Sequence, residues 1–367
     1  MLFHWYLFVF LIIFYVFSRT ANQRYRVYVA GDYEGRYKWF TALVIIGVLT
    51  YVAAMRYERF IDTGAYISGF KKSGSSWGDI LNILERDGKD KGFDILVVVL
   101  KALLGEHYRI YLGVIAGFCL LCVFGVYRKH SSNLFMSAFL FIASGEFVMW
   151  THNGMRQFIA VSMIFAATDL LLRKKYIPYC LIVLLASTIH GSALIMIPVT
   201  LVVQGKPWNI KAISMLLAIL AVTSSTDLLN DILIGVMENS QYSNDVEALM
   251  STDGVNIFRV LVFAIPPLLA LLFRREITRL DIPLINLAVN MSIVSLGVYI
   301  IALYTSGIYI ARIPIYFSLY NYILLPWIIE RFFEKQSAKL IHVCVMACYM
   351  AYYYYQMHIV WGDVTAK

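Results

Sequence analysis

Several charged and polar side chains stand at the edges of long apolar runs in this 367-residue chain. Guanidinium groups bind phosphate through planar, bidentate contacts, and a carboxylate can accept the proton of an attacking hydroxyl. Together these groups are suited to transfer from a phosphate-linked donor, whose leaving group gains charge as it departs. The residues concerned are Arg56, Arg59, Asp62, Tyr66, Arg156, Gln157 and Arg312.

A second candidate base is His190, in the stretch His190-Gly191-Ser192 inside an apolar run. Each of these residues also has a possible structural explanation that involves no catalysis or binding. Arg156 and Arg312 could extend to lipid headgroups, and His190 could be a hydrogen-bonded core histidine. Asp62 could simply form an ion pair with a neighbouring arginine.

The composition identifies the kind of protein that must position these residues. Hydrophobic residues make up 60% of the chain and charged residues 15%, with a mean hydropathy of +0.70. Soluble domains carry about 25% charged residues. The net charge of +8 comes from short basic clusters between apolar runs, a pattern that determines membrane topology and does not form a nucleic-acid groove. The sequence therefore predicts an all-α, polytopic integral membrane protein without a nucleic-acid partner.

The apolar runs predict about twelve transmembrane crossings in a single domain, 1–367, with both termini outside the cytoplasm. Arg19, Arg24 and Arg26 follow the first run and place residues 19–37 inside, so this run is a retained anchor. The runs lie at 2–18, 38–55, 109–127, 133–150, 156–172, 176–203, 210–225, 257–273, 282–304, 311–329 and 340–356.

One run does not fit a single crossing. Basic clusters flank residues 176–203 on both sides, so the chain must enter and return. A helix of ~28 residues is only about 42 Å long, too short to cross ~30 Å of hydrocarbon twice. The sequence predicts two short helices broken within 188–192, at a site that lines a cavity.

Two outer segments are expected. Residues 56–108 form a polar loop with a Gly/Ser-rich, flexible middle, closed by a short interfacial or re-entrant helix over 93–104. Residues 226–256 form an acidic loop with six Asp/Glu and no Lys or Arg. We expect Arg56, Asp62, Arg156 and Arg312 on this outer face.

Signatures of other chemistries are absent from the sequence. It has no P-loop, no dinucleotide fingerprint and no His-Glu-x-x-His motif. Its five cysteines lie in apolar runs, and Cys119-Leu-Leu-Cys122 lacks a second half-site. No cofactor and no metal ion is expected.

Four motifs in order resemble the EpsG-like and Wzy-type polysaccharide polymerases of bacterial surface polysaccharide pathways. They are Arg56-Tyr-Glu-Arg-Phe-Ile-Asp62-Thr-Gly-Ala-Tyr66, Asn153-Gly-Met-Arg156-Gln157-Phe-Ile-Ala160, Ala186-Ser-Thr-Ile-His190-Gly-Ser192 and Arg312-Ile-Pro-Ile-Tyr-Phe. Two positions depart from the family pattern. Asp90-Lys91-Gly92-Phe93 stands where the family often has Glu-Pro-Gly-Phe, and the His190 turn reads His-Gly-Ser where a bulky middle residue is commoner.

The resemblance implies a GT-C-like membrane glycosyltransferase of the bacterial inner membrane. Its substrate would be a polyprenyl-pyrophosphate-linked oligosaccharide, and its other partners membrane lipids and a chain-length regulator and a flippase of the same pathway. Asp62 or His190 would act as the base. Arg56, Arg156 and Arg312 would hold pyrophosphate, with Arg59, Tyr66 and Gln157 as further substrate contacts.

Three other functions remain open at this stage. A ligase that passes finished glycan to a lipid core uses similar chemistry. A flippase for the lipid-linked repeat would place charges along a central path and show paired repeats, whereas these arginines gather at one face. A membrane acyltransferase is disfavoured because no acyl-transfer His–Asp pair is evident.

Overall fold

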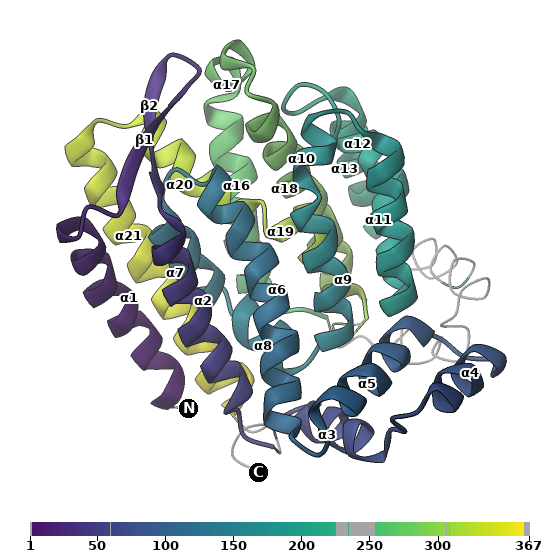
Figure 1. Cartoon of the computed structure of the whole chain (residues 1–367). Coiled ribbons are helices and arrows are strands. Elements are labelled where there is room, and N and C mark those ends of the chain that lie inside the picture. The colour runs from purple at the N-terminus through teal and green to yellow at the C-terminus, as the bar shows by residue number, and fades with distance from the viewer. Residues whose placement is uncertain are drawn as a thin grey trace. The chain divides into compact units, whose positions relative to one another are not determined.

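The computed structural model of the protein describes residues 2–58, 60–224, 234, 254–305, 307 and 309–362 (Figure 1). The described part of the chain is mostly helical. It divides into two compact units: unit 1 comprises Met1–Leu194 and Lys339–Lys367, and unit 2 comprises Ile195–Ala338.

Unit 1 holds the N-terminal helices and the C-terminal part of the chain. Its elements are α1 (Leu2–Thr20), β1 (Arg24–Val29), β2 (Asp32–Tyr37), α2 (Trp39–Ala54), α3 (Thr63–Lys72), α4 (Trp77–Glu85), α5 (Lys91–Leu104), α6 (Tyr108–His130), α7 (Leu134–Ala143), α8 (Glu146–His152), α9 (Met155–Ala166), α10 (Thr168–Leu172) and α11 (Tyr176–Ile189). The helix α21 (Lys335–Tyr354) continues into it from unit 2 and ends in the π-helical turn Tyr355–Val360.

Small residues let α2 and α6 pack closely in the centre of unit 1. Gly113 and Gly117 are four residues apart on α6, and a Cβ at Gly113 would lie 3.3 Å from the Cβ of Ala54 on α2. This is the small-xxx-small spacing by which membrane helices bring their backbones together. The helices α9 and α11 continue the row beyond α6, and α5 contacts α6 and α11.

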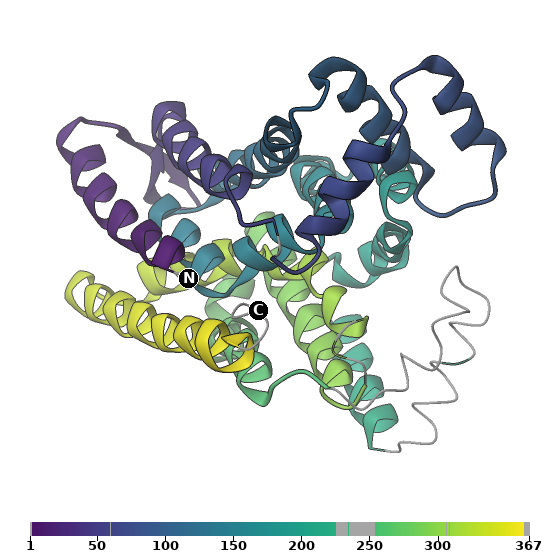
Figure 2. The same ribbon diagram turned by 90° about the horizontal axis from the view of Figure 1, so that it is seen from below.

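Aromatic rings join α1 to α21 on the other side of unit 1. The Trp5 and Tyr353 ring centroids are 5.4 Å apart, and Phe8 lies 5.2 Å from Tyr353 and 5.3 Å from Phe139 of α7. Figures 1 and 2 both show α1 and α21 side by side, with the N-terminus near the C-terminal end of α21. Edge-to-face contacts of this kind add to the burial of large rings.

The prediction of an all-α chain is wrong for one segment. Residues 24–37, part of the segment between the first two predicted spans, form the antiparallel hairpin β1–β2, in which Tyr28 is paired with Tyr33. Alternating Arg, Tyr and Val residues favour strand, and Ala30 and Gly31 adopt the positive φ angles that a tight hairpin turn requires. The hairpin is anchored by Arg36, which donates from Nε to the Lys129 carbonyl at 2.9 Å.

The expected outer loop also contains more structure than predicted. Its Gly/Ser-rich middle is helical on both sides, since α3 and α4 precede α5. The start of α4 is a capping box, in which Asp79 accepts from the Ser76 backbone nitrogen at 2.8 Å and the Ser76 hydroxyl accepts from the Asp79 nitrogen. The capping sequence Ser-x-x-Asp was present in the sequence, and such a box fixes a helix start. The predicted short helix over 93–104 is confirmed as α5.

Unit 2 is built around one long helix, α18. Its elements are α12 (Met196–Val203), α13 (Ile210–Thr223), α16 (Ile257–Leu272), α17 (Arg274–Leu280), α18 (Pro283–Leu303), the 3-10 turn η3 (Ile310–Arg312), α19 (Ile315–Ser318) and α20 (Asn321–Phe332). The fully buried Asn290 of α18 donates to the Val203 and Lys206 carbonyls at 3.0 and 3.1 Å, and its oxygen accepts from the Trp208 nitrogen at 3.0 Å. These bonds fix the turn after α12 against α18.

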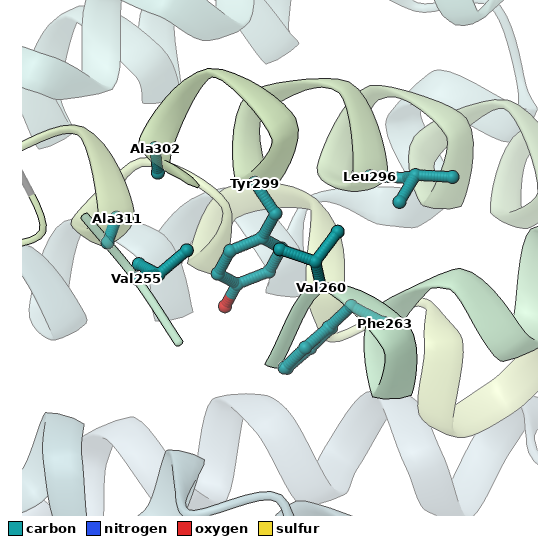
Figure 3. Close-up of a cluster of buried hydrophobic side chains, with 7 residues drawn as sticks. All are labelled: Val255, Val260, Phe263, Leu296, Tyr299, Ala302 and Ala311. Carbon is teal, nitrogen blue, oxygen red and sulfur yellow. The ribbon is translucent and has the colours of Figure 1, made fainter. Parts of the chain in front are cut away.

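A cluster of buried apolar side chains joins α16, α18 and η3 in unit 2 (Figure 3). The Phe263 and Tyr299 rings lie 4.5 Å apart at its centre. Ala311 of η3 belongs to the same cluster, so the neighbouring Arg312 is held at a defined place in this unit.

The described helices include several that are long and apolar enough to cross a membrane. Three qualify outright: α6, the pair α9–α10 (Met155–Leu172) and α18. The count rises to five if each of two bent pairs is one span, namely α7–α8, bent by 66°, and α16–α17, bent by 71°. Shorter apolar helices add to these, so the structure supports a multi-pass membrane protein, and the number of twelve crossings stays a prediction.

The predicted break in the run 176–203 is confirmed. The helix α11 ends at Ile189, His190 is extended at φ −154° and ψ 115°, and a 3-10 turn (Gly191–Ile195) follows.

Segments of unit 1 that were predicted to lie on opposite sides of the membrane are also separated in the structure. The hairpin and the end of α6 lie at one end of the unit, and α3, α4 and α5 lie at the other (Figure 1).

Candidate functional site

The polar end of unit 1 contains a cavity of about 650 Å³. Its walls come from α3, α4, α5 and the first turns of α6 and α9. Three residues expected at the site line it, Asp62, Tyr66 and Arg156, beside the aromatic side chains of Phe93 and Tyr111. Segments separated by about a hundred residues in the chain therefore meet in one pocket.

Asp62 stands at the N-cap of α3 but does not cap it. Its side chain accepts no hydrogen bond from the helix, and it is half-buried. The first turn of α3 is fixed elsewhere, because the Asp62 carbonyl accepts from the Tyr66 nitrogen at 3.1 Å and the buried Thr63 hydroxyl donates to the His152 carbonyl at 3.3 Å. The carboxylate is held by its backbone and is open to a ligand in the cavity.

Arg156 enters the cavity from the first turn of α9. Its Nη1 donates to Asp90 Oδ2 at 3.2 Å, and its Cζ lies 5.8 Å from the centroid of the Phe93 ring. Nearly half of the side chain, 46%, remains exposed. A guanidinium forms up to five hydrogen bonds, so it has donors left for an anion after binding Asp90.

Tyr66 lines the same cavity as Asp62 and Arg156. Burial raises the pKa of its hydroxyl, Arg156 opposes the rise and Asp62 adds to it. Its ring meets Phe93 edge-on, with centroids 6.1 Å apart. The hydroxyl is therefore a neutral donor and acceptor at neutral pH, and the charges of both groups act on its pKa.

Asp90 is the residue of this site that the sequence analysis did not select. It lies just before α5 in the left-handed region, at φ 56°. Its Oδ2 accepts from Arg156, and its Oδ1 accepts from the Gly191 nitrogen at 3.2 Å, directly after His190. Burial raises the pKa of this carboxyl, and Arg156 opposes that effect. Through these two hydrogen bonds, the Asp90 carboxylate links the start of α5 to the start of α9 and to the break after α11.

A signal for Asp90 was present in the sequence. Where the resemblance suggests Glu-Pro-Gly-Phe, this chain has Asp90-Lys91-Gly92-Phe93, so Asp90 supplies a carboxylate three residues before Phe93. An aspartate in place of a glutamate keeps the negative charge and shortens the side chain by one methylene group.

His190 lies at the predicted break but does not line the 650 Å³ cavity. Its Nδ1 is 2.7 Å from the Ser192 hydroxyl. The neighbouring Gly191 reaches the site through Asp90. That His190 itself lines a cavity stays a prediction.

The other expected site residues that the structure describes are not among those that line this cavity. Gln157 is 3% exposed and is turned into the helix bundle. Arg56 is buried and lines a different cavity of the same unit. Arg312 belongs to unit 2 and is half-buried in η3. Arg59 lies outside the described residues, as does most of the acidic segment 226–256.

Metal-ligating side chains do not gather at this cavity. Across the described ranges, no group of three or more His, Cys, Asp or Glu side chains has a geometry that could hold a metal ion. The polar lining of the cavity includes the carboxylate of Asp62, the phenol of Tyr66 and the guanidinium of Arg156, together with the Arg86–Asp94 ion pair.

The family model for EpsG matches residues 38–362, most of the chain and every residue of the site. The chain belongs to the EpsG family. The resemblance seen in the four sequence motifs is thereby confirmed. As an EpsG-family membrane protein, the chain is linked to exopolysaccharide biosynthesis. No curated protein and no solved structure gives a significant match.

Gly92 is expected to be essential to the geometry of this EpsG-family site. A Cβ at this position would lie 2.3 Å from the Thr188 hydroxyl oxygen and 2.8 Å from the Thr188 carbonyl oxygen, so any side chain separates α5 from the end of α11. Overpacking of this kind costs about 1–3 kcal/mol. We expect Gly92→Ala to lower the melting temperature of the purified protein by several degrees and to weaken the Asp90–Gly191 contact.

The control for this substitution is Gly47→Ala in α2. Gly47 is exposed, lies in a helix and would place its Cβ within 4 Å of nothing. Alanine at such a position is neutral or slightly stabilising. A melting temperature of Gly92→Ala that equals that of Gly47→Ala would show that α5 and α11 do not pack as described.

Proposed function

We propose that this chain is a polysaccharide polymerase, a membrane glycosyltransferase that joins polyprenyl-pyrophosphate-linked oligosaccharide repeats. We place the reaction on the extracytoplasmic face of the bacterial inner membrane. The observation that carries the proposal is that one cavity of an EpsG-family membrane protein is lined by both the Asp62 carboxylate, which does not cap α3, and the partly exposed Arg156 guanidinium.

The proposed transfer forms one glycosidic bond and breaks one bond to phosphate. A hydroxyl oxygen of the acceptor sugar attacks the anomeric carbon of the donor, and its proton passes to the Asp62 carboxylate. The bond from that carbon to the pyrophosphate oxygen breaks, and the electron pair leaves with the pyrophosphate. Arg156 donates hydrogen bonds to the charge that develops on this leaving group, which is the position where a preorganised cation lowers the barrier most.

The neighbouring residues support these two roles. Asp90 holds the Arg156 guanidinium in place through one Nη, so less side-chain freedom is lost when the anion binds. Tyr66 is suited to hydrogen-bond a sugar hydroxyl or a phosphate oxygen. The aromatic Phe93 offers a face on which a sugar ring could pack. We further propose Arg312 and Arg59 as additional phosphate contacts, and His190 as the alternative base.

The size of the cavity fits a sugar-phosphate substrate. Ligand pockets usually span about 300–1,000 Å³, and the volume of about 650 Å³ lies within that range. Polar side chains of α4 and α5 continue the lining beyond Asp62, as an oligosaccharide acceptor with many hydroxyls requires; they include Asp79, Asn82, Arg86 and Asp94.

The glycan made by cells that lack the protein separates this function from its rivals. A missing polymerase leaves surface glycan of single-repeat length, because repeats are still made, exported and attached. A missing flippase leaves no surface glycan, and a missing ligase leaves long glycan that is not attached. We expect single-repeat glycan, and either other result would contradict the proposed function.

A further inference from the structure

A second cavity, of about 390 Å³, lies in unit 1 and shares no lining residue with the one described above. It is formed where α1, the end of α2, α8 and the end of α21 meet. Arg56 lines it, together with the aromatic side chains of Trp5, Phe60 and Tyr353.

Arg56 is a buried charge without a counter-ion in the described structure. The residue is 9% exposed; its Nη1 donates to the Thr151 carbonyl and its Nη2 lies 2.7 Å from the Met155 sulfur. Its Nε is buried and has no hydrogen-bond partner. None of the ion pairs formed by the described residues includes Arg56.

The charge on Arg56 persists at neutral pH. Burial lowers the pKa of its guanidinium to about 10, which is still well above neutrality. Buried charges in proteins are normally paired with an opposite charge, because neither a carbonyl nor a thioether replaces the water that was lost. An anion seated in the cavity would supply the missing partner.

Apolar and aromatic side chains make up much of the cavity wall and favour an anion that also has an apolar part. The rings of Trp5 and Tyr353 meet edge-on at 5.4 Å, and Phe60 closes the wall beside the buried His152, with ring centroids 5.3 Å apart. The helices that border the cavity, α1 and α21, carry exposed apolar side chains further along, such as Ile12 at 65% and Val343 at 57%. In a membrane protein such surfaces face lipid tails.

We infer that this cavity binds the phosphate headgroup of an amphiphilic lipid. Arg56 is the anion-binding group, and the aromatic walls enclose the first part of the tail, which continues along α1 and α21. A polyprenyl phosphate and an anionic glycerophospholipid share this chemistry. The inference does not depend on the proposed function, because it concerns binding in a cavity separate from the one assigned to transfer.

The test measures binding to the purified full chain in detergent, by native mass spectrometry and by the rise in melting temperature. The probes are undecaprenyl phosphate and phosphatidylglycerol, each compared with its phosphate-free counterpart, undecaprenol or diacylglycerol. We expect at least one phosphate lipid to bind and to stabilise the protein, and neither alcohol to do so. Preference for undecaprenyl phosphate identifies a substrate-derived lipid, and equal or stronger binding of phosphatidylglycerol identifies a bilayer lipid.

Two variants and one control assign the binding to this cavity. Arg56→Gln keeps an amide that can donate to the Thr151 carbonyl but removes the charge, and Val52→Phe fills the cavity without altering Arg56. Each should weaken binding of the phosphate lipid at least about tenfold. Arg56→Gln removes one partner of a buried charge pair, which typically costs more than that, and the larger side chain of Val52→Phe takes up space that the lipid would occupy. Arg109→Gln removes an exposed arginine near the start of α6 and should leave the affinity unchanged.

Two results would overturn the inference. One is unchanged affinity in both Arg56→Gln and Val52→Phe, and the other is equal binding of the phosphate lipids and their alcohols. Because the readout contains no glycan transfer, failure here would leave the proposed polymerase function intact.

Discussion

Asp62→Asn is expected to slow glycan transfer by about 10²–10⁴, the range that a positioned general base contributes. Asparagine has nearly the same shape but cannot take the proton of the acceptor hydroxyl. Folding should be unaffected, because the Asp62 side chain does not cap α3. The measurement is the initial rate of glycan transfer by the purified variant, with its melting temperature as the control for folding.

The same assay decides between the two candidate bases. His190→Ala removes the alternative, whose Nδ1 lies 2.7 Å from the Ser192 hydroxyl and whose ring is not part of the cavity lining. We expect the loss in His190→Ala to be smaller than in Asp62→Asn and to reflect only the loosened chain around Gly191. A larger loss in His190→Ala, with Asp62→Asn close to wild type, would transfer the role of base to His190.

Arg156→Ala is expected to lower the rate by about 10²–10³, since losing one preorganised donor to a developing anion costs ~2.7–4 kcal/mol. Lysine should restore only part of the activity, because it keeps the charge but not the planar fork. The ion pair with Asp90 is partly exposed and adds little to stability, so neither variant should unfold. Arg109→Ala serves as the matched control, because it removes an exposed arginine outside the cavity.

The kcat and KM values of the arginine variants also show whether Arg156 acts on the transition state or only on substrate binding. If Arg156 acts on the leaving group, kcat falls and KM changes little, as expected for a contact strengthened in the transition state. A rise in KM at constant kcat would indicate that Arg156 only holds the substrate. Arg312→Ala should show the same fall in kcat if this arginine also contacts the pyrophosphate.

The apolar runs predicted the helices well because their signal is strong and local. The break after Ile189 was also predictable, since the length of the run and the basic clusters on both sides could not be reconciled by one straight helix. Hydropathy says nothing about segments that carry few apolar residues. The hairpin β1–β2 was missed for that reason, although its alternating Arg, Tyr and Val residues are typical of strand.

The candidate site was predicted in part. Asp62, Tyr66 and Arg156 were selected from residue type and position, and the structure brings them into one cavity. The separate location of Arg56 could not be foreseen, because the five residues between Arg56 and Asp62 do not determine which way each of the two side chains points. Asp90 escaped because its role is to join α5, α9 and the end of α11, and no local pattern reports a contact between elements so far apart in sequence.

The most direct test of the central claim uses purified protein and a purified polyprenyl-pyrophosphate-linked repeat as the sole substrate. Polymer length is followed over time by gel electrophoresis or mass spectrometry. If the cavity lined by Asp62 and Arg156 carries out the transfer, the wild-type protein and Arg109→Ala will form a ladder of repeats and release polyprenyl pyrophosphate. Asp62→Asn and Arg156→Ala, with normal melting temperatures, will leave the substrate at single-repeat length. Ladders of normal length and rate from both variants would contradict the account.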